Sequence, residues 1–141
     1  MLKQLLALTA LIPLAGCVSA QFQEDRAAAW TEYQTTIPVC ETATECRDMW
    51  EMAEVWVVKN ASYKIQTKTD VQISTYNSAD SGIQANILKE PLGNGRYRIV
   101  AHITCGAIAN ELCSAHPAFL STDFNRTLNA MKAKKPAGTS L

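Results

Sequence analysis

The strongest pattern in the chain is an apolar stripe at helical spacing between Thr42 and Asn60. The stripe consists of Cys46, Met49, Trp50, Ala53, Trp56 and Val57. Residues three and four apart share one face of an α-helix, so the stripe predicts a helix with one buried face. Thr42 or Thr44 can cap its first turn, and Lys59 lies near its end, where the helix dipole favours a positive charge.

A weaker helical pattern precedes this segment and predicts a short helix over 22–34. Its periodic positions are Phe22, Arg26, Ala29, Trp30 and Tyr33. Ile37-Pro38 ends it, because the residue before a proline disfavours helical geometry. Trp30 and Tyr33 either pack on the domain, which we favour, or lie at a membrane interface.

The last helix is predicted to begin at Pro117, a residue suited to a first helical turn, with His116 in the capping position before it. Its apolar stripe consists of Phe119, Leu120, Phe124, Leu128 and Met131. Lysines close the helix near residue 135, and residues 136–141 are expected to form a flexible tail.

Between these helices the apolar period changes to two, which predicts β-structure. Residues 63–75 form one long strand, or two joined by a bend near Thr69-Asp70, and further strands are predicted at 83–90 and 96–105. Asn94-Gly95 suits the positive φ of a hairpin turn. We therefore expect an α+β fold in the order α-α-β-β-β-α. A three-stranded antiparallel meander would carry two helices on one face of a two-layer sandwich.

The cysteines predict that this domain is cross-linked by disulfide bonds. Five are present, and Cys17 has a separate role described below. The other four favour local bridges, Cys40–Cys46 and Cys105–Cys113, with crossed pairing as the alternative. A zinc site built from all four is disfavoured because their spacings do not match the tight pairs of zinc knuckles, so no metal is expected.

The N-terminal segment predicts the destination of the protein. Lys3 precedes an apolar run over 5–14, and Leu14-Ala15-Gly16-Cys17 follows. The run is too short to span a membrane. This arrangement resembles the signal peptide of bacterial lipoproteins. The resemblance implies removal of residues 1–16, lipidation of Cys17, and a lipidated tether over 17–21 before a single domain over 22–135.

Val18 and Ser19 follow the cysteine, where an aspartate often signals retention in the inner membrane of the lipoprotein class. The resemblance therefore implies an outer-membrane anchor on the periplasmic side. The inner membrane, or secretion after ordinary cleavage near Ala20, is the alternative. The chain carries equal numbers of basic and acidic side chains, which gives no general attraction to nucleic acid.

One group of basic residues defines a candidate binding surface on the polar side of the predicted sheet. The group is Lys64, Lys68, Arg96, Arg98 and His102. It can dock an anionic partner or glycan, although a solvated sheet face is the simpler interpretation. The two histidines lack metal-ligand spacing, and no nucleophile-elbow motif is present, so we expect neither a cofactor nor catalysis.

The mature segment also resembles a small family of uncharacterised exported bacterial proteins, a resemblance that implies no activity. It rests on Cys46 to Trp56, Tyr63-Lys64-Ile65-Gln66, Thr69-Asp70, Thr75-Tyr76-Asn77 and Asp123-Phe124-Asn125-Arg126. Asp123 and Arg126 are three apart and predict a helix-surface pair.

Two hypotheses for the function follow from these patterns. The first is an anchored, non-catalytic accessory module that binds an envelope protein or peptidoglycan. The alternative is a small-ligand-binding or enzyme-inhibitor lipoprotein, which uses a pocket between helix and sheet or the loop between Cys105 and Cys113. An exposed apolar patch favours the first hypothesis, and a closed cavity favours the second.

Overall fold

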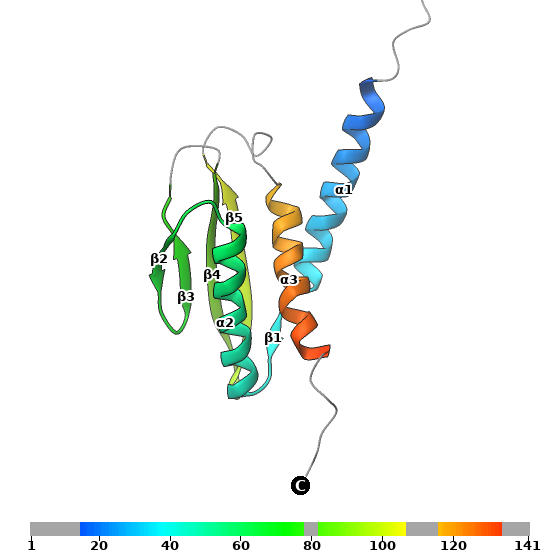
Figure 1. Cartoon of the computed structure of the whole chain (residues 1–141). Coiled ribbons are helices and arrows are strands. Elements are labelled where there is room, and N and C mark those ends of the chain that lie inside the picture. The colour runs from blue at the N-terminus through cyan, green and yellow to red at the C-terminus, as the bar shows by residue number, and fades with distance from the viewer. Residues whose placement is uncertain (1–14, 78–81, 107–115, 134–141) are drawn as a thin grey trace, which may run out of the picture.

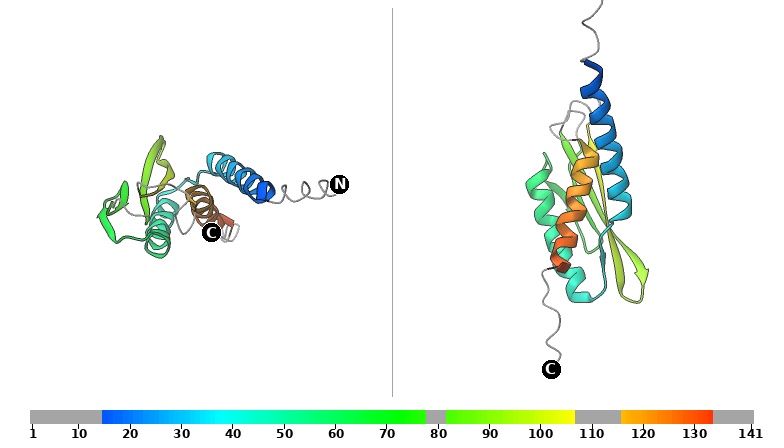
Figure 2. Two further views of the ribbon diagram at one scale, coloured as in Figure 1. Left: turned by 90° about the horizontal axis from the view of Figure 1, so that it is seen from above. Right: turned by 90° about the vertical axis from the view of Figure 1, so that its right-hand side faces the viewer.

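The helices and the β-sheet lie in separate layers (Figure 1). The computed structural model describes residues 15–77, 82–106 and 116–133. In chain order the elements of this part are α1 (Ala15–Thr35), β1 (Val39–Cys40), α2 (Ala43–Asn60), β2 (Ile65–Lys68), β3 (Gln72–Thr75), β4 (Ile83–Gly93), β5 (Arg96–Cys105) and α3 (Pro117–Ala133). Helices α2 and α3 cover one face of the sheet, and α1 lies along α3 on the side away from α2 (Figure 2).

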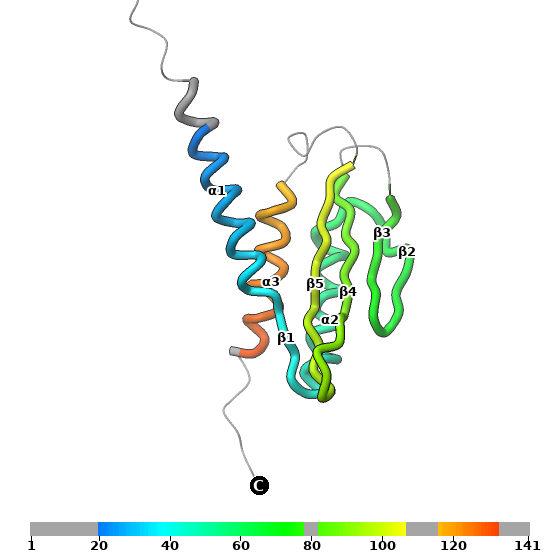
Figure 3. The backbone as a smooth tube through the Cα atoms, turned by 180° about the vertical axis from the view of Figure 1, so that it is seen from behind, coloured from blue at the N-terminus to red at the C-terminus, as the bar shows by residue number. Residues whose placement is uncertain are grey.

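The sheet has five antiparallel strands in the order β1-β5-β4-β3-β2, so the predicted three-stranded meander is wrong (Figure 3). Of the two arrangements predicted for residues 63–75, the structure has two strands, β2 and β3, joined by a turn at Thr69-Asp70. The turn is fixed by Thr69, whose N–H donates to the Gln72 carbonyl at 2.8 Å and whose Oγ1 accepts the N–H groups of Val71 and Gln72. A threonine side chain that binds the backbone in this way favours a turn over a continuous ladder.

Strand β1 is the second difference from the predicted sheet. Val39 pairs with Arg98 and Cys40 pairs with Tyr97, which places β1 on the outer side of β5. Two residues are too few to show a period of two, and their hydrogen bonds reach a segment almost sixty residues away. The α+β class itself is correct, and so is the placement of two helices, α2 and α3, on one face of the sheet.

Helix α2 forms as its sequence predicts. Thr42 is the N-cap, and its Oγ1 accepts the N–H of Glu45 at 3.2 Å. The Glu45 carboxylate in turn accepts the N–H of Glu41 at 2.9 Å, which completes a reciprocal capping arrangement. All six residues of the predicted stripe are buried against the sheet. On the sheet side the core contains Ile73, Ile83, Ile87, Ile99 and Ile103, and Phe124 and Leu128 of α3 complete it.

Helix α1 is longer than the predicted 22–34 segment, because residues 15–21, which include the predicted tether over 17–21, are also helical. It is held to the rest of the molecule by a few specific hydrogen bonds. The Tyr33 hydroxyl donates to the carbonyl of Ala101 in β5 at 2.7 Å, and the Thr122 hydroxyl of α3 donates to the carbonyl of Ala29 at 2.7 Å. Tyr33 therefore packs on the domain, whereas Trp30 is 48% exposed. Among the described residues, no helix is both long and apolar enough to cross a membrane.

One predicted disulfide is confirmed. Cys40 of β1 and Cys46 in the first turns of α2 are bonded, with their Cα atoms 5.0 Å apart. Both cysteines are buried in the core, so the bridge fixes β1 to the start of α2. Cys105 is also disulfide-bonded. Its predicted partner, Cys113, lies outside the described residues, as does the loop proposed for ligand insertion.

Candidate functional site

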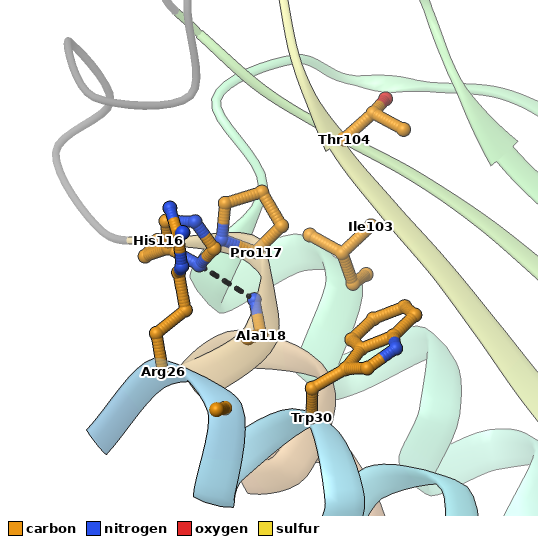
Figure 4. A pocket seen from close by; sticks show the side chains of 8 residues that line it. Arg26, Trp30, Ile103, Thr104, His116, Pro117 and Ala118 are labelled. Carbon is orange, nitrogen blue, oxygen red and sulfur yellow. Dashed lines mark hydrogen bonds between the residues drawn. The ribbon is translucent and has the colours of Figure 1, made fainter. Parts of the chain in front are cut away.

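A cavity of about 420 Å³ lies where α1, the end of β5 and the start of α3 meet (Figure 4). Eight residues line it: Arg26, Ala27, Trp30, Ile103, Thr104, His116, Pro117 and Ala118. Most of these side chains are apolar, and the polar groups are few. A concave site of a few hundred cubic ångströms with this balance is typical of pockets that bind small molecules.

The cavity exists because α1 follows only part of β5 closely. Strand β1 pairs with β5 at Tyr97 and Arg98, and Tyr33 contacts β5 at Ala101. Beyond Ala101, β5 continues to Cys105 with no strand of the described residues on its outer side. Trp30 lies one turn before Tyr33, and its ring stands across this open edge from Ile103 (Figure 4).

His116 has a structural role at the mouth of the cavity. Its Nδ1 accepts the N–H of Ala118 at 3.1 Å, which caps the first turn of α3 as its position before Pro117 predicts. Partial burial is the main cause that lowers the pKa of His116 below its ordinary value of 6.5, and the nearby charge of Arg26 adds to this effect. Because Nδ1 is an acceptor, the neutral ring carries its proton on Nε2.

Arg26 is the cation of the site. Its guanidinium donates to the side-chain carbonyl of Gln23, and in the part of the chain that the structure describes it forms no ion pair. Arg26 extends from α1 toward His116 (Figure 4). Within the described residues, the site therefore places a guanidinium without a carboxylate partner at one end of an apolar cavity.

Three aromatic rings form a cluster beside the cavity. Phe22 of α1 lies 6.1 Å from the ring of His116 and 6.1 Å from that of Phe119, and His116 and Phe119 are 6.0 Å apart. All three contacts have edge-to-face geometry, which the aromatic quadrupole favours. Phe22 and Phe119 are 42% and 37% exposed. Phe22, His116 and Phe119 therefore form one aromatic surface on α1 and the start of α3. Trp30 contacts Tyr33 instead, with ring centroids 5.1 Å apart.

The predicted basic surface is not one surface in the structure. Arg98 pairs with Glu90 at 2.5 Å, Arg96 approaches Glu41 at 3.8 Å, and Lys68 pairs with Glu54 of α2. Lys64 lies before β2, and His102 is exposed opposite Asn86. Neither forms an ion pair among the described residues. Three of the five predicted cationic groups are thus neutralised locally, which weakens the case for an anionic partner on this face.

Lys68 lies apart from the cationic groups of β5 because of a β-bulge in β2. Ile65 is opposite Thr75, but after the bulge Lys68 is opposite the core residue Ile73. Residues directly opposite one another point to the same face, so Lys68 lies on the helix-covered side. Arg98 and His102 lie on the other side of the sheet. An alternating pattern carried through residues 63–75 could not reveal this change of parity.

The described residues contain no group of three or more histidine, cysteine, aspartate or glutamate side chains arranged to hold a metal ion. Cys17 lies within α1, but its side chain is outside the described atoms, so its predicted lipidation stays a prediction. Comparison with protein-family models, curated proteins and solved structures finds no match for this chain. The function must therefore be argued from the residues themselves.

Sequence reasoning identified Trp30 and His116 singly but did not bring them together. Arg26, Ile103 and Ala118 belong to three elements that are distant in the chain, and each fits its own helical or strand pattern. No local signal marks a cavity whose walls meet only after α1 has packed on α3. The unpaired charge of Arg26 on an otherwise apolar helix face is the one hint the sequence offered.

Proposed function

We propose that this protein is a bacterial lipoprotein, anchored through Cys17 to the outer membrane on its periplasmic side, and that it acts as a non-catalytic interaction module of the cell envelope. The anchor is supported by Leu14-Ala15-Gly16-Cys17 at the end of a short apolar run. The disulfide between Cys40 and Cys46 fits an oxidising compartment such as the periplasm.

The observation that carries the interaction role is the aromatic surface of α1 and α3. Phe22 and Phe119 are 42% and 37% exposed, although each is large and apolar, and their rings lie 6.1 Å apart. Exposed apolar groups that cluster, instead of occurring singly, mark interaction sites in soluble domains. Aromatic residues are also those enriched at the centres of protein interfaces. We therefore infer an envelope protein as the partner, with peptidoglycan as the competing outcome.

The geometry of α1 relates this surface to the anchor. An α-helix rises about 1.5 Å per residue, so Phe22 lies only about 8 Å along the axis from Cys17. A lipidated Cys17 would hold Phe22, and Phe119 beside it, close to the membrane, where a membrane-associated partner is within reach. The module requires no chemistry of its own. Among the described residues, neither histidine is hydrogen-bonded to a carboxylate or to a side-chain hydroxyl.

The anchor and the surface can be tested together. Mass spectrometry of the protein purified from envelopes should show a mature chain that begins at Cys17 and carries acyl chains. Crosslinking in intact envelopes should then capture one main partner with the wild-type chain. Cys17→Ala and Phe22→Ser should each lose that partner. Val58→Ser, which changes a 67% exposed apolar residue of α2, is the matched control and should retain it.

Each result has a distinct meaning. An unmodified N-terminus near Ala20 would overturn the anchor. A partner that persists in Phe22→Ser would overturn the assignment of the aromatic surface. Binding of the wild-type chain to purified sacculi without any crosslinked protein would replace the protein partner with peptidoglycan.

A further inference from the structure

We infer that the cavity between α1, β5 and α3 is a binding site for a single-chain anionic amphiphile, with the anion at Arg26 and the alkyl chain against Trp30 and Ile103. This inference goes beyond the interaction role proposed above and does not depend on the anchor. It rests on three features of the cavity: its size, its lining and the placement of its charge.

The lining favours an apolar chain. Trp30, Ile103, Pro117 and Ala118 supply apolar surface from all three elements around the cavity. Ile103 and Ala118 are themselves buried, and they present a fixed wall. The volume of about 420 Å³ lies within the range of pockets that take small organic ligands. The cavity is partly open to solvent, which gives a ligand access to it.

The charge favours an anion. Arg26 lines the cavity without an ion pair in the described residues, and a guanidinium binds a carboxylate or phosphate through two parallel hydrogen bonds. One neutral donor stands beside it, because His116, with Nδ1 engaged by Ala118, has its Nε2–H available. Among the described residues, the cavity lining around Arg26 contains no carboxylate that would compete with an anionic ligand.

Other parts of the molecule offer weaker evidence for a ligand site. The groove between α1 and α3 on the opposite side of α1 is lined by the ion-paired Glu32 and Arg126, whose charges already satisfy one another. The open sheet face has its arginines paired with glutamates. Of the clusters in the described residues, the one around Arg26 combines a free cation with an apolar enclosure.

The inference can be tested with decanoate, below the concentration at which it forms micelles, and the full chain carrying Cys17→Ala. Calorimetry should show binding of one decanoate per chain. The NMR cross-peaks of Ile103 and Ala118 should shift. The tryptophan fluorescence should also change, and the change is assigned to Trp30 because Trp50 and Trp56 are buried away from the ligand. Decyl phosphate should bind comparably, since both head groups suit a guanidinium. Decyltrimethylammonium, with the same chain and opposite charge, and inorganic phosphate, with no chain, should not bind at the same concentrations.

Two pairs of variants separate the site from nonspecific uptake. Arg26→Gln should weaken decanoate binding by about ten-fold to a hundred-fold, because it removes a charge-assisted hydrogen-bonding group, whereas Arg47→Gln should leave binding unchanged. Ala27→Phe places a large side chain in the cavity from an exposed helical position and should block binding. Ala28→Phe, at the neighbouring exposed position on the other side of α1, should not.

Equal binding of the cationic and anionic amphiphiles would overturn the inference, as would binding that survives both Arg26→Gln and Ala27→Phe. If decanoate fails to bind while crosslinking still captures an envelope partner, the interaction role stands and the ligand site is wrong. If decanoate binds while no partner is captured, the ligand site stands and the interaction role is wrong. The two proposals therefore fail separately.

Discussion

The side-chain amide of Asn125 in α3 donates a hydrogen bond of 2.9 Å to the main-chain carbonyl of Tyr33 in α1. Asn125 is fully buried, and its amide nitrogen also lies 3.3 Å from Oγ1 of Thr36. Asn129, one turn later, donates to the carbonyl of Thr36 at 2.8 Å. The last carbonyls of a helix lack hydrogen-bond donors within it. Two asparagines of α3 supply donors to the carbonyls at the C-terminal end of α1. This contact orients α1 and thereby determines one wall of the cavity.

We expect Asn125→Ala to lower the free energy of unfolding by about 1–3 kcal/mol, because it leaves the Tyr33 carbonyl with only the long 3.4 Å hydrogen bond from the Thr36 N–H. Urea unfolding followed by circular dichroism measures this change. Asn77→Ala, at an exposed position after β3, is the matched control and should change the stability by less than about 0.5 kcal/mol. Equal effects of the two substitutions would show that the α1–α3 contact does not depend on this amide.

The disulfide between Cys40 and Cys46 should contribute measurably to stability. The chain-entropy model predicts a loss of about 2–3 kcal/mol for the double substitution Cys40→Ala/Cys46→Ala, because the short loop between them is no longer closed in the unfolded chain. The double substitution isolates this bridge, whereas a reductant would also act on Cys105. Denaturant unfolding of the two proteins under oxidising conditions measures the difference. A loss well below 1 kcal/mol would contradict the expectation.

The elements that could be predicted are those whose signals are local. Helix α2 carries its cap, its stripe and its basic end within one segment, and the structure has all three. The hairpin between β4 and β5 is likewise encoded in two or three residues. Asn94 has φ of 54° and Gly95 of 74°, as the Asn94-Gly95 pair predicts. His116 caps α3 as its position before Pro117 indicates.

The features that could not be predicted depend on partners far away in the chain. Arg126 and Asp123 are three apart in α3 and predict a local pair, yet Arg126 binds Glu32 of α1 and Asp123 accepts the indole N–H of Trp56 at 2.8 Å. Strand β1 exists because β5 is beside it, and the cavity exists because α1 leaves β5 beyond Ala101. Each of these contacts requires the tertiary arrangement, which a single sequence does not specify by periodicity.

The Glu32–Arg126 ion pair predicts a dependence of stability on pH. Two nitrogens of Arg126 lie 2.6 Å from the two carboxylate oxygens of Glu32, and this hydrogen bonding lowers the pKa of Glu32 from its ordinary value of 4.5. A lowered pKa in the folded state gives stability that is present above pH 4.5 and lost as the pH falls through the lowered value. The pair is exposed, so its contribution should be small and should weaken further at high salt.

Thermal unfolding of the wild-type chain and of Glu32→Gln at several pH values measures this contribution. The wild-type chain should melt at the higher temperature at pH 7, and the difference should close as the pH falls below 4.5 and through the lowered pKa of Glu32. Glu24→Gln, which removes an exposed carboxylate with no ion pair among the described residues, should show no such closing difference. A difference between the wild-type chain and Glu32→Gln that is independent of pH would contradict the role of the charge.

His116 predicts a second pH dependence, at the site itself. Partial burial lowers the pKa of His116 below 6.5 in the folded state, and Arg26 lowers it further, so the folded chain holds the ring neutral where the unfolded chain binds a proton. Stability is therefore fully present above pH 6.5 and is lost as the pH falls through the window between the unfolded and folded values. Protonation also removes the Nδ1 acceptor that caps Ala118, so the first turn of α3 should loosen on the acid side of this window.

Proton NMR of the histidine rings during a pH titration measures this effect directly. The midpoint for His116 should lie below the value of the same residue in the urea-unfolded chain, and Arg26→Gln should raise it because it removes a neighbouring positive charge. The protection of the Ala118 and Phe119 amides against hydrogen exchange, relative to their intrinsic rates at each pH, should fall as the pH falls through the same range. An identical His116 midpoint in the wild-type chain and in Arg26→Gln would mean that the guanidinium does not face the ring, and would remove the electrostatic basis for an anion at this position.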